Sequence, residues 1–487
     1  MSAISIRTAP VARLLGLFLV LFGIAMLPAA GVGLAMGDAE FRLILAGALP
    51  VSAAGGLLFL LFRANRSELT VRESLLLVML IWISASAAGS IPFVLSGRFP
   101  HFADAFFECA SGFTTTGASV LPEVEVLPPA VQFWRHYTHW LGGMGIVLLM
   151  IAVLPVIGMG GVNLFRAHSA GMKSDKLKPR MFDTASTLWR VYIALTLAEY
   201  AMLRLAGMTP FDAICHTFSS LGTGGFSTHS TSAAYFRSPA IEYILALFML
   251  LASINFARHY QVWALRDPRA YARDPEVRLH LGLTAAATCA IGYSLVASNG
   301  YGIHTAFRAA LFQVVSIISC TGFASDDYEK WPYVAQFILF VLMWIGGNGG
   351  STAGGVKTFR VLMLFRAIRH AFRRITQPRR IFSVRLGDAA LDEPQVHSLL
   401  TMILITVMFY VAAVVAVTAG GVDLLTGLTA VISCMSGVGP AWGSAGPTEN
   451  YAGISESAKW VLSACMLAGR VELYAFLVLF LPSFWRD

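Results

Sequence analysis

Four short segments of the sequence decide the fold: Ser111-Gly-Phe-Thr-Thr-Thr-Gly117, Ser219-Ser-Leu-Gly-Thr-Gly-Gly225, Ser316-Ile-Ile-Ser-Cys-Thr-Gly322 and Ser433-Cys-Met-Ser-Gly-Val-Gly439. In each segment a serine stands six residues before the last glycine. The last glycines recur at intervals of roughly a hundred residues, which is typical of an internal repeat. Four similar units therefore predict fourfold pseudosymmetry around one axis.

Apolar stretches of two lengths surround each segment. A mostly apolar stretch of about twelve residues precedes the segment, and a longer apolar span lies before and after it. A membrane-crossing helix needs about 20 residues, so the short stretches predict re-entrant half-helices. Backbone that is not helical at membrane depth is tolerated only where protein or a wet cavity encloses it. Each unit thus predicts a span, a half-helix, an extended loop and a second span, with the four loops enclosing one another.

The composition places the whole chain in a membrane. Of 487 residues, 56% are hydrophobic and 13% are charged, which excludes a soluble enzyme, a disordered chain and a peripheral protein with one anchor. The first apolar run is too long for the core of a signal peptide, so we expect it to stay as a helix. The six cysteines lie in apolar segments without CxxC spacing, so we expect neither a disulfide framework nor a zinc site.

These patterns predict an all-α polytopic membrane protein with four pseudo-repeats around a central pore and an extra N-terminal helical pair. The expected domains are an N-terminal extension at 1–66 and pore repeats at 67–180, 181–275, 276–390 and 391–487. The expected spans are a pair within 11–62, followed by 72–96, 131–158, 186–207, 239–265, 277–299, 331–375, 395–419 and 456–482.

The basic residues indicate the orientation. The net charge is +8, and most of the 35 Lys and Arg residues fall at 63–72, 166–190, 258–278 and 357–385. These stretches alternate with segments that hold few bases, as the positive-inside rule requires. We therefore expect both termini on the cytoplasmic side of a bacterial inner membrane, and we read the positive charge as topology instead of a nucleic-acid surface.

The four loops have the chemistry of a cation path. A permeant cation exchanges its water for fixed oxygens, and rings of backbone carbonyls supply these without buried charge. Glycine adopts the backbone angles that such loops need, and threonine hydroxyls add further oxygens. The half-helix before each loop points its partially negative carboxyl end inward, which favours a cation over an anion. One such loop alone would be an ordinary helix break, whereas four in register indicate a pore.

The residues resemble a known family at this point. Phe113-Thr-Thr-Thr-Gly-Ala118, Gly222-Thr-Gly-Gly-Phe-Ser-Thr-His229, Thr321-Gly-Phe323 and Gly437-Val-Gly-Pro440 look like the four filter loops of the superfamily of K⁺ transporters (Trk/Ktr/HKT). Within it, the chain is similar to the TrkH/TrkG branch of bacterial potassium uptake proteins. The likeness covers nearly the entire chain, including His139-Trp-Leu-Gly-Gly-Met-Gly145 and Gly469-Arg-Val-Glu472.

The resemblance implies a K⁺ selectivity filter and K⁺ as the permeant ion, with Rb⁺ as a surrogate. The implied filter residues are Thr115, Thr116, Gly117, Thr223, Gly224, Gly225, Cys320, Thr321, Gly322, Gly437, Val438 and Gly439. Glycine at 117 favours K⁺, because related plant transporters with serine at that place tend to prefer Na⁺. Cys320 departs from the threonine that relatives often carry, which removes a side-chain oxygen and leaves the backbone carbonyl.

A second glycine-rich stretch lies inside the expected span 331–375. It has six glycines in thirteen residues between Gly346 and Thr358, which should unwind the helix. It fails the phosphate-loop pattern, because Val356 stands where that pattern requires glycine before the lysine. The resemblance implies an intramembrane gating loop, and glycines for close helix packing are the alternative. The implied gating residues are Gly346, Gly347, Asn348, Gly349, Gly350, Ser351, Thr352, Ala353, Gly354, Gly355, Lys357 and Arg470.

Arg470 lies in an otherwise apolar span, where an unpaired charge is costly. The resemblance implies that it faces the pore below the filter and interacts with the gating loop. The alternative is a salt bridge between helices, with Glu472 or another acid. Neutralising it should increase conductance if the pore interpretation holds.

Several polar residues recur at fixed distances from the filter glycines. Asp104 and Asp212 each precede their glycine by thirteen residues, so we expect them to cap the half-helices. Asp326 and Asp327 flank the third outer mouth, where we expect solvated loop residues. Nine residues before their glycines stand three side chains that we expect to support the loops from behind: Glu108, His216 and Gln313.

The expected function is potassium uptake through this filter, driven by the membrane potential and controlled by the gating loop. The resemblance also implies a homodimer and a cytosolic TrkA-like nucleotide-binding regulatory subunit, which would dock on the nine bases from Lys357 to Arg385. Membrane lipids are a further partner for these bases. We expect no cofactor bound by this chain, no nucleic acid and no enzymatic activity. The alternatives are a Na⁺- or H⁺-coupled cation symporter, an organic-solute secondary transporter and a membrane enzyme that binds a nucleotide.

Overall fold

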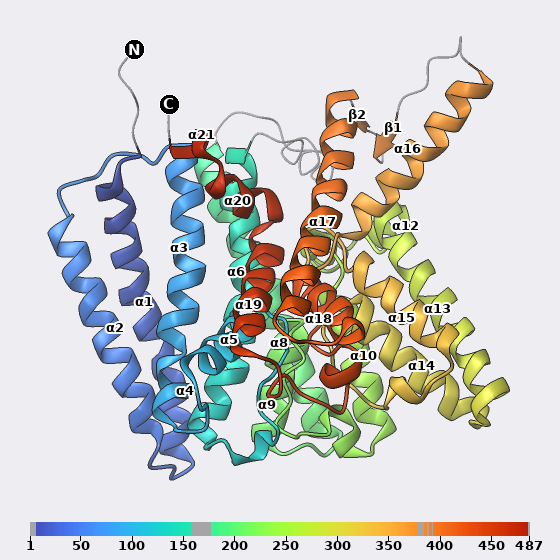
Figure 1. The fold of residues 1–487 in the computed structure, drawn as a ribbon, viewed down its shortest axis with the longest axis horizontal. Helices are drawn as coiled ribbons and strands as arrows, with labels where there is room; N and C mark the ends of the chain where they lie inside the picture. The colour runs from blue at the N-terminus through green and yellow to red at the C-terminus, as the bar shows by residue number, and fades with distance from the viewer. Residues whose placement is uncertain (1–5, 158–176, 378–383, 387–388, 392, 486–487) are drawn as a thin grey trace.

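The computed structural model describes residues 6–157, 177–377, 384–386, 389–391 and 393–485. The chain forms a bundle of helices, with a short antiparallel hairpin beside α16 (Figure 1). The helices before the hairpin are α1 (Thr8–Ala35), α2 (Phe41–Leu61), α3 (Val71–Gly89), α4 (Ile91–Leu95), α5 (Phe102–Phe113), α6 (Pro129–Ile157), α8 (Leu177–Leu205), α9 (Pro210–Leu221), α10 (Pro239–Ala252), α11 (Phe256–Trp263), α12 (Arg269–Arg273), α13 (Pro275–Asn299), α14 (Ile303–Ile318), α15 (Tyr333–Ile345) and α16 (Thr358–Thr376). The remaining strands and α-helices are β1 (Val384–Leu386), β2 (Ala389–Leu391), α17 (Glu393–Ala419), α18 (Leu424–Ser436), α19 (Glu456–Val471), α20 (Leu473–Leu477) and α21 (Pro482–Trp485).

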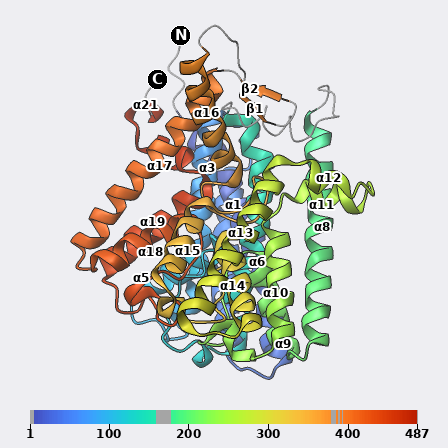
Figure 2. The same cartoon turned by 90° about the vertical axis from the view of Figure 1, so that its right-hand side faces the viewer.

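The predicted fold class is confirmed, because the described residues are almost entirely helical and follow the expected order. The N-terminal pair is α1 and α2, and the four half-helices are α5, α9, α14 and α18. Figures 1 and 2 show the half-helices packed together in one half of the bundle, with the termini and α16 at the opposite end. The hairpin of β1 and β2 was not predicted. The domain boundaries stay a prediction.

Capping residues determine where several of these helices begin. Thr70 and Glu73 form a capping box at the start of α3, in which each side chain accepts a hydrogen bond from the other's backbone N–H. At the start of α9, the Thr209 hydroxyl accepts from the N–H of Asp212 at 3.1 Å. The predicted cap at Asp104 is also present, since its Oδ2 accepts from the His101 N–H at 3.2 Å. Such caps satisfy amides that would otherwise be unpaired at the helix starts.

Two of the expected spans, 239–265 and 456–482, are sharply bent in the structure. The axes of α10 and α11 differ by 102°, and those of α19 and the segment after it by 120°. Asn255 starts a new helix by accepting the Ala257 N–H at 2.9 Å. Glu472 ends α19 because its φ of 72° is incompatible with a right-handed helix.

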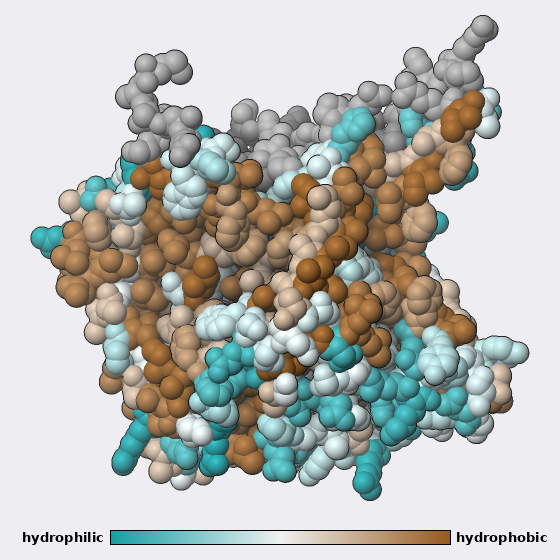
Figure 3. Space-filling model, viewed as in Figure 1, coloured by the Kyte–Doolittle hydropathy of each residue, from teal (hydrophilic) through white to brown (hydrophobic). Residues whose placement is uncertain are grey.

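The outer surface fits a membrane environment. Five of the described helices are long and apolar enough to cross a membrane, or seven if each bent pair counts as one span. The expected ten spans also include α6, α8 and the α15–α16 pair; α6 packs between α3 and α8. Figure 3 shows a broad apolar region over the bundle and polar side chains toward the half-helix end. Of the predicted basic stretches, residues 166–176 and 378–383 lie outside the described part of the chain.

Candidate functional site

The four predicted filter segments share one backbone shape, and we call residues 115–117, 223–225, 320–322 and 437–439 together the four-loop ring. Each segment follows the end of its half-helix. The first residue of each segment has a positive φ, at Thr115 (53°), Thr223 (54°), Cys320 (57°) and Gly437 (73°). The last glycine also has a positive φ, at Gly117 (81°), Gly225 (77°), Gly322 (86°) and Gly439 (98°). This conformation costs a non-glycine residue about 1–3 kcal/mol, so the surrounding structure must hold it in place.

The repeated serines provide part of that support. In every segment the N–H of the middle residue donates to the backbone carbonyl of the serine six residues before the last glycine. The four pairs are Thr116 to Ser111 at 2.8 Å, Gly224 to Ser219 at 2.8 Å, Thr321 to Ser316 at 2.8 Å and Val438 to Ser433 at 2.9 Å. Because each amide bonds back to its own half-helix, the four segments turn in the same way. This geometry explains the spacing that the sequence repeats.

The segments close into a ring in the order of the sequence. A Cβ atom on any last glycine would lie closer than 3.0 Å to the carbonyl oxygen of the middle residue in the next segment. These pairs are Gly117 with Gly224, Gly225 with Thr321, Gly322 with Val438 and Gly439 with Thr116. The last pair joins the fourth repeat to the first. Glycine is therefore required at each of these positions for two reasons: the backbone has a positive φ, and a Cβ atom would collide with the neighbouring carbonyl.

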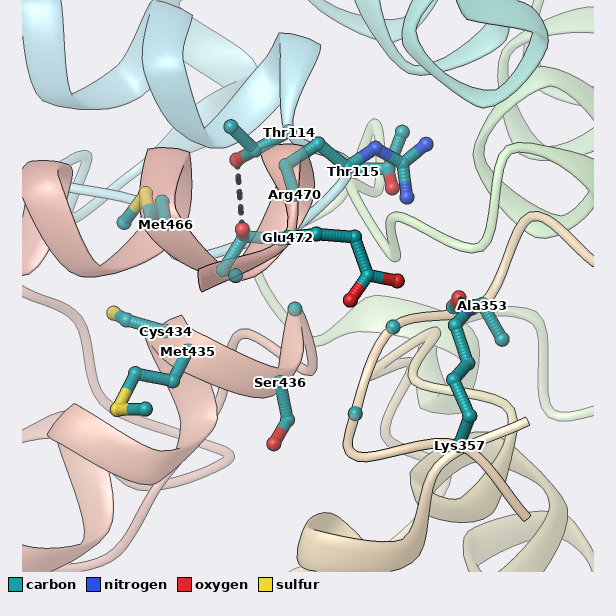
Figure 4. A pocket seen from close by; sticks show the side chains of 15 residues that line it. Thr114, Thr115, Ala353, Lys357, Cys434, Met435, Ser436, Met466, Arg470 and Glu472 are labelled. Carbon is teal, nitrogen blue, oxygen red and sulfur yellow. Dashed lines mark hydrogen bonds between the residues drawn. The ribbon is translucent and has the colours of Figure 1, made fainter. Parts of the chain in front are cut away.

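The ring separates two cavities. The outer cavity is lined by all four last glycines together with loop residues from all four repeats, including Tyr451 and Glu449. The inner cavity is lined by residues 114–116 and Gly437, by the glycine-rich loop and by α18 and α19. Figure 4 shows side chains from these elements around the inner cavity. A path through the ring would thus lead from one cavity to the other.

The side chains nine residues before the last glycines support the loops from behind, as the sequence predicted. Glu108 accepts from the Ser119 hydroxyl and the Val120 N–H, both at 2.9 Å. The His216 ring lies within hydrogen-bond distance of the Ser227 hydroxyl, at 3.1 Å. The third such side chain is Gln313, which donates to the carbonyl of Phe323 at 3.4 Å.

The glycine-rich stretch interrupts its helix, as predicted. Helix α15 ends at Ile345 and α16 begins at Thr358, with an irregular loop between them. The base of the loop is closed by N–H donation from Lys357 to the Ile345 carbonyl at 2.9 Å. Close packing also occurs, because a Cβ atom on Gly354 would collide with the Ser436 carbonyl at the end of α18. The loop therefore lies against the fourth half-helix and lines the inner cavity.

Arg470 connects this loop to the helices around it. Its guanidinium donates to the Thr352 carbonyl of the loop at 2.8 Å and to the Gly142 carbonyl of α6 at 2.9 Å. The alternative of a salt bridge with Glu472 is wrong, because Glu472 pairs with Arg360 at 2.7 Å. Lys357 also faces the cavity and donates to the Ala353 carbonyl. Two positively charged side chains thus lie beside the inner cavity, where they donate to backbone carbonyls.

The structure gives different contacts to the three remaining acids that the sequence analysis singled out. The cap expected at Asp212 is made instead by the Thr209 hydroxyl, and the Asp212 carboxylate accepts hydrogen bonds from the hydroxyls of Thr209 and Thr228. Asp326 is not simply solvated, because it accepts from the Tyr301 hydroxyl at 2.9 Å and from the Trp331 indole at 3.2 Å. Asp327 pairs with Lys330 at 3.0 Å.

Among the buried charged residues that the sequence did not point to, three hold elements of the site. Arg135 on α6 pairs with Glu108 at 2.6 Å, and Lys459 on α19 pairs with Asp104 at 2.7 Å. Glu276 accepts the N–H groups of Gly349 and Phe359, at 2.7 and 3.0 Å. A charged side chain within or beside an apolar span was the available signal, because such residues need a partner.

Comparison with known proteins defines the class. The family model described as TrkH, cation transport protein, matches residues 41–486, so the chain belongs to the TrkH family of cation transport proteins. It is a membrane transport protein and not an enzyme.

Individual relatives agree over the full length. The Trk system potassium uptake protein TrkH of Salmonella typhimurium is 38% identical over 483 residues, covering 98% of this chain and 99% of the relative. TrkG of Escherichia coli is 31% identical over 479 residues, covering 98% of each. The crystal structure of the potassium transporter TrkH from Vibrio parahaemolyticus matches with a TM-score of 0.91 and 34% identity, over 99% of this chain and 100% of that one.

Proposed function

We propose that this protein takes up K⁺ across the inner membrane of a bacterium and that the four-loop ring is its selectivity filter. The observation that carries the proposal is the closed ring of middle-residue carbonyls, which lies between two cavities. Carbonyl dipoles replace the water of a monovalent cation without placing a fixed charge in the path. The names of the relatives, which are potassium uptake proteins, support K⁺ as the ion.

The glycine-rich loop is the gate in this proposal. It lies below the ring, touches the end of α18 through Gly354 and is held by Arg470 through the Thr352 carbonyl. A cation leaving the ring enters a cavity whose wall this loop forms. Replacing the loop with a short linker should raise K⁺ flux in the absence of any partner. Unchanged flux at normal protein amount would contradict the gating role.

The proposed orientation places both termini and α16 in the cytosol. The half-helices then lie toward the outside (Figure 1), and each segment of the ring follows the carboxyl end of its half-helix. Inward movement of one cation gains about 2.3 kcal/mol per 100 mV, which supports a roughly 50-fold gradient without a coupling ion. In proteoliposomes, Rb⁺ entry should follow an imposed voltage with no pH or Na⁺ gradient. A strict need for either gradient would favour the symport alternative.

A homodimer and a cytosolic TrkA-like regulatory subunit complete the proposal. Helix α16 projects away from the bundle in Figure 1. It carries exposed apolar side chains such as Phe372 and Ile375 among its basic residues. An amphipathic basic helix of this kind suits a protein partner or anionic lipid. Any nucleotide acts on the partner, and this chain holds no nucleotide itself.

The test of the filter uses cells that lack their own potassium uptake. The full chain is expressed with a regulatory subunit, and growth at low K⁺ and the initial rate of Rb⁺ entry are measured. The variants G117S and G225S place a side chain against the neighbouring carbonyl, so we expect Rb⁺ entry to fall at least tenfold and discrimination against Na⁺ to weaken. G282S is the matched control, because a Cβ atom there meets nothing within 4 Å.

Two outcomes would overturn the filter proposal. One is normal Rb⁺ entry and unchanged discrimination in both ring variants. The other is no Rb⁺ entry by the parent chain with its regulator present. In the second case, uptake of an organic solute by the same cells would favour the secondary-transporter alternative.

A further inference from the structure

A buried network connects the backbone just outside the ring in repeat 1 with the same region in repeat 2. Arg135 Nε donates to Glu108 Oε1 at 2.6 Å, and Arg135 Nη1 donates to the Ser227 carbonyl at 3.1 Å. The Arg135 Cζ also lies 3.5 Å from the centre of the Phe226 ring. The arginine thus comes from the span after the first loop and holds the two residues that follow Gly225.

The acid of the pair holds the first loop. Glu108 lies on α5, and its oxygens accept the Ser119 hydroxyl and the Val120 N–H, which are two and three residues beyond Gly117. Both partners of the ion pair are buried, with side-chain exposures of 2% for Arg135 and 0% for Glu108. A charge-assisted hydrogen bond in such a place is short and resists displacement by water. The pair therefore sets the spacing between two neighbouring loops of the ring.

This spacing bears on ion choice. A carbonyl ring discriminates between K⁺ and Na⁺ through its size or through the number of dipoles that reach the ion, and both depend on how firmly the loops are held. In the described residues, Gly117 already abuts the Gly224 carbonyl, so a small shift of one loop moves carbonyls of both repeats. We propose that Arg135, through Glu108, is a specificity-determining positioning residue that keeps loops 1 and 2 at the K⁺-selective spacing. The inference rests on the proposed filter.

Charge gives a rival explanation that the experiment must separate. Arg135 also lines the outer cavity, where a positive charge repels an entering cation. E108Q leaves that positive charge unbalanced, whereas R135Q leaves a negative one. If the pair acted only by its charge, the two variants would shift cation entry and ion preference in opposite directions. If it acts by position, both variants loosen the loops and shift the preference in the same direction.

The experiment measures initial rates of Na⁺ and Rb⁺ entry in cells lacking their own uptake systems, with the regulatory subunit present and rates scaled to the amount of protein in the membrane. The variants are R135Q, R135K and E108Q. We expect the Na⁺-to-Rb⁺ ratio to rise about fivefold in R135Q and E108Q. R135K should lie between these variants and the parent, because an ammonium cannot reproduce the planar fork that reaches Glu108 and Ser227 together.

The matched control is R308Q. Arg308 on the half-helix α14 pairs with Glu242 on α10 at 3.2 Å, and this pair also joins a half-helix to a span. Neither residue hydrogen-bonds a loop of the ring among the described contacts. The ion ratio of R308Q should equal that of the parent, whatever its effect on protein amount.

A folding defect is separated from the positioning role by the double variant E108Q/R135M. Loss of one partner leaves a buried charge, whereas loss of both is often tolerated. The proposal is supported if the double variant reaches the parental amount of protein in the membrane while its Na⁺-to-Rb⁺ ratio stays high. A parental ratio in the double variant, unchanged ratios in both single variants or opposite shifts would overturn it. The filter itself fails separately, if G117S and G225S also leave the ratio unchanged.

Discussion

At the scale of single residues, short-range geometry determines most of the site. The residue six positions before each last glycine accepts the middle N–H of the same segment through its backbone carbonyl, which explains the spacing. In repeats 3 and 4 the serine at this position also donates its hydroxyl to a loop carbonyl, that of Phe323 or Pro440. That relation is local, so the sequence repeat contains it. The partners of Arg470 are different, because Gly142 and Thr352 are far from it in the sequence. The sequence indicated that this charge needs partners and left them open.

Arg470 yields the prediction at this scale. R470Q removes a positive charge on the inner-cavity side of the ring. Two unit charges about 4 Å apart interact with an energy of about 1–4 kcal/mol, depending on solvent exposure, so the arginine opposes a passing cation. We expect Rb⁺ entry to rise about tenfold, measured as the initial rate at matched protein amount. R470K keeps the charge and should stay near the parent. A lower protein amount with no gain in rate per molecule would instead indicate a purely structural role for the hydrogen bonds.

At the scale of elements, the contacts that hold the glycine-rich loop include three from α13, α18 and α19. Arg470 bonds its Thr352 carbonyl from α19, Gly354 packs on the end of α18, and Glu276 holds it from the first turn of α13. One oxygen of Glu276 accepts N–H groups from both the loop and α16. The loop was predicted from its glycines, whereas these anchors come from other helices.

Glu276 should act as a latch on the proposed gate. E276A removes two charge-assisted hydrogen bonds, and a net loss of about 1.4 kcal/mol would raise the open fraction about tenfold. We expect a matching rise of Rb⁺ entry without the regulatory subunit, compared with the parent. D267N is the control, because the Asp267 carboxylate accepts from the Arg269 N–H and the Arg273 guanidinium on α12 and makes no contact with the glycine-rich loop among the described hydrogen bonds. A latch role for Glu276 is excluded if Rb⁺ entry by E276A without the regulatory subunit equals that of the parent, while replacement of the loop raises Rb⁺ entry.

At the scale of the whole molecule, the repeats are joined outside the ring. Tyr451 donates its hydroxyl to the Gly439 carbonyl and its N–H to the Ser119 carbonyl, which ties repeat 4 to repeat 1. The Tyr328 hydroxyl donates to the Ala441 carbonyl and ties repeat 3 to repeat 4. Such contacts close the ring into one body, so a change in one repeat is felt in its neighbour.

The opposite end of the molecule carries the predicted docking surface. R369E with R373E reverses two charges on α16, which lies at the end opposite the half-helices in Figure 1. We expect the affinity for a TrkA-like subunit to fall about tenfold at low salt and less in high salt, because salt screens exposed charges. Binding of the purified full chain to that subunit would be measured across a KCl series. R98E, on the half-helix side, is the control; equal weakening by R98E would contradict a localised surface.

The sequence alone determined the number of repeats, the half-helices and the interruption at Gly346, because apolar length, glycine and serine spacing act within a few turns of backbone. It also indicated the four segments in which the ring residues lie. Only the tertiary structure decided that Gly439 meets the Thr116 carbonyl, that Glu472 pairs with Arg360, and that Arg135 bridges two loops. Those contacts join residues distant in the sequence, and packing of whole helices selects one partner among many that local chemistry would allow.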